Sequence, residues 1–97
     1  MIEVTKNAQG EFKRIMTEEG KGHAGIRLGV KGGGCSGYSY VMDFVKDPKD
    51  NDTMFNDQST PIYIDPKSLD LIDGIVIDFS TDLLNRGFKF KNPNATQ

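Results

Sequence analysis

A chain of 97 residues, of which 36% are hydrophobic and 27% are charged, suits a single domain with a modest core. Twelve basic and fourteen acidic residues give a net charge of −2, which argues against the strongly basic surface of a nucleic-acid-binding protein. The single cysteine excludes a disulfide within the chain, and no apolar run reaches the roughly 20 residues that span a bilayer, so we expect a cytoplasmic protein without a membrane partner.

The N-terminal region predicts a helix over residues 5–19. Thr5 is a suitable N-cap and Gly20 a suitable stop for it. The apolar side chains of this segment recur at helical spacing, at Ala8, Phe12, Ile15 and Met16. We expect this helix to lie on the surface and cover a sheet.

Two strands are predicted next, on either side of a glycine-rich segment. Residues 26–30 alternate apolar with other side chains, and residues 38–45 do so over a greater length. The second strand is fairly apolar on both faces, so we expect it to be central in its sheet. Eight of the eleven glycines lie between Gly20 and Gly37, and the loop that joins the two strands carries Cys35.

The second half of the chain predicts short elements. Residues 46–60 read as a solvated loop with a short edge segment at 54–55, and their aspartates lack the third acidic ligand and the glycine of an EF-hand loop. Asp65 and Pro66 predict the N-cap and first turn of a short helix near 66–72. The remaining apolar runs predict strands at 62–64, 75–79 and 87–91. Short strands with only two helices indicate a mainly β domain that spans residues 1–97.

The loop around Cys35 is the most distinctive stretch of the sequence. Four glycines, at 32, 33, 34 and 37, surround this thiol, and they allow another group to approach the backbone closely. A thiol on such a loop is accessible to a partner thiol and is suited to a soft metal. Free cysteines are often plain core residues, but a core cysteine more often has apolar neighbours.

Three other interpretations of this loop are weaker. Its glycines match a dinucleotide-binding fingerprint literally, but a strand and not a helix follows them. A cysteine hydrolase would need a histidine base, and His23, the only histidine, is expected to be an exposed loop residue, so we expect no enzymatic activity. Tyr38 and Tyr40 are expected to pack within a strand, where metal ligation is disfavoured.

A metal site closed within one chain needs three or four Cys or His ligands, whereas this chain has one of each. The residues leave three possibilities open. The site is shared between subunits, ligands come from elsewhere, or the thiol has another role.

Nearly the whole chain resembles the A-type iron–sulfur carriers, the IscA/SufA/HesB group. The resemblance rests on seven ordered segments: Gly25–Lys31, Gly34–Gly37, Tyr40–Phe44, Ile64–Leu69, Leu71–Gly74, Ile77–Phe79 and Gly87–Ala95. It implies a compact β-sandwich-like domain of the HesB type, with an N-terminal helix and one short helix near 66–72. It also implies a homodimer or homotetramer that receives cargo from cluster scaffold proteins and delivers it to apo iron–sulfur proteins.

The resemblance implies which residues bind the cargo. Cys35, supported by Gly34, Ser36 and Gly37, matches the cysteine that ligates iron or an iron–sulfur cluster in the family. The family has two further cysteines in a Cys-Gly-Cys motif shortly after its Asn-Pro-Asn segment. This chain stops at Gln97, where that motif would begin, and we expect the natural protein to continue into it. The alternatives are a metal-free interaction or scaffold domain and a thiol-redox protein that uses Cys35.

Overall fold

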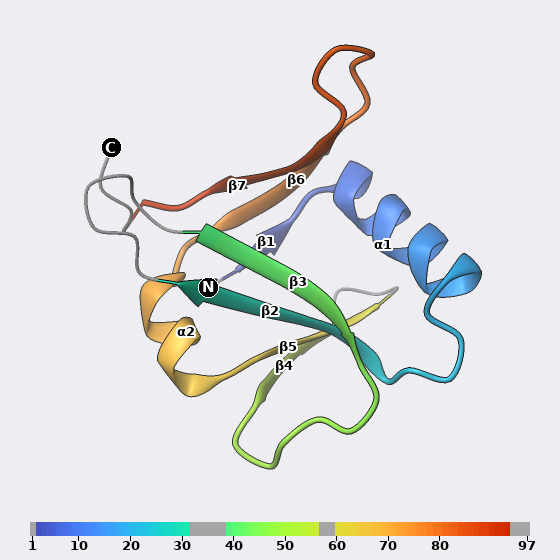
Figure 1. Ribbon diagram of the computed structural model, residues 1–97. Helices are drawn as coiled ribbons and strands as arrows, with labels where there is room; N and C mark the ends of the chain where they lie inside the picture. Colours follow the sequence, from blue (N-terminus) through green and yellow to red (C-terminus); the bar gives the residue numbers. More distant parts are fainter. Residues whose placement is uncertain (1, 32–38, 57–59, 94–97) are drawn as a thin grey trace.

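The computed structural model describes residues 2–31, 39–56 and 60–93, and Figure 1 shows their arrangement. The two predicted helices are present, as α1 (Lys6–Glu18) and α2 (Pro66–Leu71). The strands are β1 (Glu3–Val4), β2 (Gly25–Lys31), β3 (Ser39–Val45), β4 (Thr53–Asn56), β5 (Pro61–Ile64), β6 (Val76–Ser80) and β7 (Gly87–Lys91). Neither helix in this part of the chain is long and apolar enough to cross a membrane.

The strands form two sheets. One has three strands in the order β1-β6-β7, and the other has four in the order β3-β2-β5-β4. The pairs β1–β6 and β2–β5 are parallel, whereas β2–β3, β4–β5 and β6–β7 are antiparallel. The prediction of a compact, mainly β, sandwich-like domain with two helices is therefore confirmed.

Helix α1 packs against the three-stranded sheet through the stripe predicted from its spacing. Phe12 stacks on Phe88 at 4.9 Å between ring centroids, and Phe79 meets Phe88 edge-on at 4.9 Å. Thr5 caps the helix by accepting the Ala8 N–H at 3.2 Å. The fully buried side chains of the core come from α1, from both sheets and from the segment after α2, and they include Phe12, Leu28, Ile62, Ile64, Ile72, Ile75 and Ile77.

The prediction that residues 38–45 form a central strand is wrong, because β3 lies at the edge of its sheet. Not all of the apolar side chains of β3 are covered by the rest of the protein. Tyr40, Met42 and Phe44 are half-buried and join the core, whereas Val41 on the other face is 44% exposed. Apolar residues on both faces of a strand therefore did not mean two covered faces. Strand β1, which is two residues long, was not predicted at all.

In the loop before β4, the side chain of Asp52 makes its contacts within the protein. The Asp52 carboxylate pairs with Arg27 of β2 and accepts the Lys49 N–H at 2.8 Å, and its side chain is 1% exposed. The Arg27 guanidinium holds the pKa of Asp52 below its ordinary range. This ion pair ties the loop to the sheet, and β4 forms the edge segment that was predicted at 54–55.

Candidate metal centre

Cys35 and its supporting residues Gly34, Ser36 and Gly37 lie outside the described residues, as does Tyr38. The structure does describe the strands on either side of this segment and the parts of α2 and β7 that contact them, and we call these elements the frame. Strand β2 ends at Lys31 and β3 begins at Ser39, and these two residues face each other in the antiparallel register. The segment 32–38 therefore joins the ends of two adjacent strands.

The end of β2 is held by α2. Past Arg27, β2 no longer pairs with β5, and the Val30 N–H donates instead to the Ser68 hydroxyl at 3.1 Å. Ser68 is buried, and its own N–H donates to the Asp65 carboxylate at 3.1 Å. Hydrogen bonds from the Ser68 hydroxyl and from its N–H hold the pKa of Asp65 below its ordinary value, so the cap of α2 is ionised at neutral pH.

The last described residues of the chain reach the same end of the molecule. Phe90 of β7 stacks on Tyr40 of β3, with ring centroids 4.7 Å apart and planes 14° from parallel. The Asn92 side chain donates to the Leu71 carbonyl of α2 at 2.8 Å. Pro93 lies over Gly74, where an added Cβ would be 3.2 Å from the proline ring. In Figure 1 the ends of β2 and β7 and the start of β3 gather beside α2.

A groove with a volume of about 610 Å³ runs between α2 and the outer face of β2 and β3, next to the frame. Two lysines, Lys31 and Lys67, contribute to it, and Asp65 is the carboxylate among its described lining residues. These lining residues are Gly29, Val30, Lys31, Val41, Asp65, Lys67, Ser68 and Leu71. Cations next to a loop cysteine favour the thiolate, which is the form that binds metal.

The structure also describes Tyr40 and His23, which were considered in the sequence analysis. Tyr40 lies in a strand, β3, as predicted, and its ring stacks on Phe90 of β7, a partner that was not predicted. The prediction that His23 is exposed is wrong. Its ring is half-buried, lies 5.2 Å from the Phe44 ring and has Nδ1 3.3 Å from the Gly20 carbonyl oxygen. Within the described ranges no three His, Cys, Asp or Glu side chains gather closely enough to hold a metal ion.

Sequence reasoning missed the support given by Ser68 and Asn92. Asp65 was recognised as a helix cap, but the bond from Val30 to Ser68 joins residues 38 positions apart. The bond from Asn92 to Leu71 spans 21 positions. The sequence around Ser68 and around Asn92 gives no indication of these distant partners.

Comparison with known proteins shows which family the chain belongs to. The model of the family described as iron–sulphur cluster biosynthesis matches residues 1–97. The chain belongs to this family. It is 44% identical over 94 residues to the iron-binding protein IscA of Enterobacter sp. (strain 638), an alignment that covers 97% of this chain and 87% of the relative. The corresponding protein of Klebsiella pneumoniae is also 44% identical, with the same coverage.

Solved structures of the family have the same fold. The crystal structure of Escherichia coli SufA, described as involved in the biosynthesis of iron–sulfur clusters, matches with a TM-score of 0.83 and 34% identity, over 98% of this chain and 82% of that one. The crystal structure of IscA with a [2Fe-2S] cluster matches with a TM-score of 0.84 and 31% identity, over 100% of this chain and 89% of that one.

Proposed function

We propose that this protein is a carrier and not an enzyme, and that its cargo is iron or an iron–sulfur cluster bound through Cys35. Its family is one of iron–sulfur cluster biosynthesis, and relatives at 44% identity are named iron-binding proteins. One observation of the structure carries the proposal. The strands that flank Cys35 and the end of β7 converge on α2, so the Cys35 loop and the segment after Pro93 start from the same end of the molecule.

The chemistry of the frame suits a thiolate ligand. Lys31 directly precedes the Cys35 loop and lines the groove beside the end of β2 together with Lys67, so two cations border the start of this segment. The glycine N–H groups next to Cys35 in the sequence are suited to donate hydrogen bonds to cluster sulfurs. Ligands on a glycine-rich loop are also easier to exchange than ligands in a closed site, and exchange is what delivery to an apoprotein requires.

Cys35 supplies one thiolate, fewer than a cluster needs, so we propose that the cargo is held between copies in a homodimer or homotetramer. Apo iron–sulfur proteins are the recipients, and cluster scaffold proteins are the donors. The compartment we propose is the cytoplasm, where reducing conditions keep a lone thiol available.

The test is anaerobic reconstitution with ferrous iron and sulfide, followed by visible absorbance and iron content. We expect Cys35→Ser to abolish both signals, because a hydroxyl does not replace a thiolate as a cluster ligand. His23→Ala is the matched control, since it removes the only histidine of the sequence, and it should keep both signals. Cluster absorbance retained in Cys35→Ser, or lost in His23→Ala, would contradict the proposal.

A further inference from the structure

Strand β2 carries a glycine, Gly29, in its interior, where glycine weakens a strand relative to residues with a side chain. Gly29 is not among the described glycines with a positive φ, and the register of β2 with β3 runs without a bulge from Gly25 to Lys31. A Cβ added at Gly29 would also have room, because the nearest described atom is the Val41 carbonyl oxygen at 4.0 Å. The described part of the fold therefore does not require glycine here. Such a glycine often marks a place where a ligand or another backbone approaches closely.

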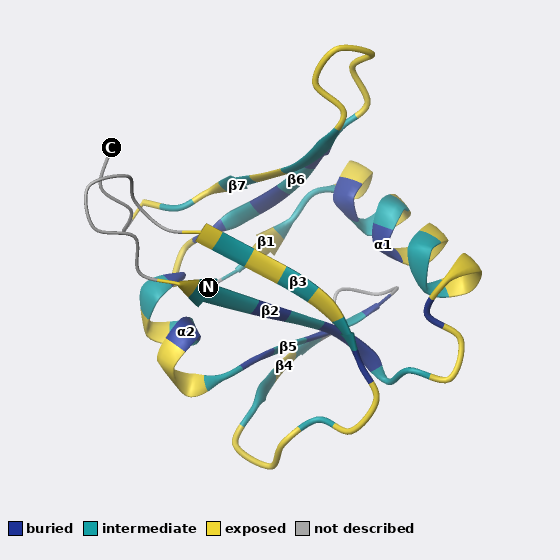
Figure 2. Ribbon diagram, viewed as in Figure 1, coloured by how far each residue is buried: buried dark blue, intermediate teal, exposed yellow. Residues whose placement is uncertain are grey.

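The space above Gly29 belongs to the groove of about 610 Å³ between α2 and the outer face of β2 and β3. The floor of this groove is apolar, since Val41 is 44% exposed and Leu71 is half-buried. Figure 2 shows exposed and half-buried residues alternating along β3, and Val41 is one of the exposed ones. Because Gly29 contributes no side chain to the floor, a second chain could lie close to β2 at this point.

The groove also presents two free cations. Lys31 and Lys67 line it, and both side chains are exposed. Neither lysine takes part in an ion pair among the residues that the structure describes. They lie at this groove in a chain whose net charge is −2.

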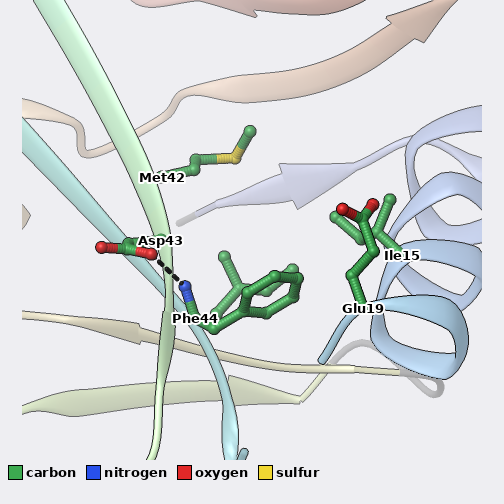
Figure 3. A pocket seen from close by; sticks show the side chains of 6 residues that line it. Ile15, Glu19, Met42, Asp43 and Phe44 are labelled. Carbon is green, nitrogen blue, oxygen red and sulfur yellow. Dashed lines mark hydrogen bonds between the residues drawn. The ribbon is translucent and has the colours of Figure 1, made fainter. Parts of the chain in front are cut away.

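The neighbouring carboxylates have other roles. Asp65 lines the groove, but its carboxylate accepts the Ser68 N–H at 3.1 Å and caps α2. Asp43 of β3 is turned to its own backbone, where its carboxylate accepts the Phe44 N–H at 2.8 Å, as Figure 3 shows. Asp70 of α2 lines a different pocket. The two lysines are therefore available to an anionic partner.

We infer that this groove receives an extended acidic segment of the apoprotein to which the cargo is delivered. The backbone of the segment lies over Gly29, and its carboxylates pair with Lys31 and Lys67. The inference rests on the proposed function and adds the surface that the recipient contacts and the chemistry that it presents. A recipient must approach the Cys35 loop, and this loop starts at the end of β2, directly beside the groove.

A peptide segment fits the groove better than a small inorganic anion does. An inorganic anion would pair with the lysines but leave Val41 and Leu71 uncovered. An extended chain of alternating acidic and apolar residues offers carboxylates to the lysines and apolar side chains to the floor, and only its narrow backbone need pass over Gly29.

The binding test is nuclear magnetic resonance of the metal-free full chain, with chelator present, titrated with a short blocked peptide that alternates glutamate and valine. We expect saturable shifts of the Gly29, Val41 and Leu71 amides. The matched peptide with lysine in place of glutamate should have a dissociation constant at least about tenfold higher. Raising the ionic strength should weaken binding of the glutamate peptide, because exposed charge pairs are screened by salt.

Gly29→Val fills the floor of the groove with a side chain that suits a strand, so we expect this variant to fold and to bind the glutamate peptide at least about tenfold more weakly. Gly29→Ala is the smaller change and should have an intermediate affinity. Gly10→Ala adds the same methyl group in open space on α1, so it is the matched control and should bind like the unaltered chain.

The transfer test uses chains reconstituted with cluster and an acidic apo-ferredoxin as the recipient. Gly29→Val should keep its cluster content but transfer the cluster at least about tenfold more slowly, because the groove and Cys35 have different roles. Equal affinity for the two peptides, shifts confined to the free edge of β3, or unchanged transfer by Gly29→Val would overturn the inference. If the unaltered chain binds the glutamate peptide but takes up neither iron nor cluster, the proposed function fails while the acidic-peptide groove remains, so the two failures are distinguished.

Discussion

At the scale of single residues, Gly25 at the start of β2 has the closest neighbouring backbone among the glycines that the structure describes. A Cβ built there would lie 2.3 Å from the Pro61 carbonyl oxygen of β5 and 3.0 Å from the Tyr63 ring. The carbonyl belongs to a paired strand, so it cannot move aside as a flexible side chain would. Gly10 is the opposite case, because it lies on the exposed side of α1 and an added methyl group would meet no atom within 4 Å.

The two glycines therefore predict opposite effects of the same substitution. Gly25→Ala should lower the free energy of unfolding by about 1–3 kcal/mol through overpacking. Gly10→Ala should raise it by about 0.4–1 kcal/mol, because alanine restricts the unfolded chain and favours the helix. Urea denaturation of both variants measures the difference. A neutral Gly25→Ala would show that β2 and β5 are farther apart than the structure places them.

At the scale of elements, α2 is too short to be stable by itself and depends on its cap. It has six residues, with Pro66 in its first turn and Asp65 as N-cap. Its Ser68 also receives the Val30 N–H from β2, so the helix and the frame around the Cys35 loop share one support. Weakening the cap should therefore weaken the end of β2 as well.

Asp65→Ala should destabilise the protein by about 0.5–2 kcal/mol at neutral pH. The pKa of Asp65 is lowered from 3.8 on folding, chiefly by hydrogen bonds from Ser68, so its ionised form contributes stability above that pH. This contribution is lost as the pH falls through the lowered value, and the gap between Asp65→Ala and the unaltered chain should narrow below about pH 3.8.

Asp65→Asn is the control for this prediction, because asparagine caps a helix about as well as aspartate without titrating. It should keep most of the stability at neutral pH and show less acid dependence. Urea denaturation at neutral pH and near pH 3 measures all three proteins. If Asp65→Asn were as unstable as Asp65→Ala, capping would not be the role of this side chain.

The elements also show what the sequence could predict. Both helices were found because their caps and periodicity are local, as Thr5 and Asp65 illustrate. The edge position of β3 was missed because Val41 is apolar yet 44% exposed, and only the sheet order reveals that no strand of the described residues lies beyond it. For the site, the sequence singled out the Cys35 loop, but contacts such as Tyr40 with Phe90 depend on folding across half the chain.

At the scale of the whole molecule, aromatic contacts join α1 to the three-stranded sheet and the two sheets to each other. Phe12 of α1 packs on Phe88 in the three-stranded sheet. Tyr40 and Phe90 make a direct stack between the sheets, at the end where the Cys35 loop begins and ends. This stack adds to the buried aliphatic core, to which both sheets contribute, for example Leu28 and Ile77.

A double-mutant cycle measures this link. With Tyr40→Leu and Phe90→Leu, we expect a coupling of about 0.5–1.5 kcal/mol in the free energy of unfolding, beyond the loss from each substitution alone. Leucine keeps both positions apolar, so the cycle isolates the ring contact. A second cycle of Tyr40 with Phe88, whose ring stacks on Phe12 instead, should give a smaller coupling. Equal couplings in the two cycles would mean that the rings report general loosening of the core. In that case the Tyr40–Phe90 stack would not be a specific link between β3 and β7.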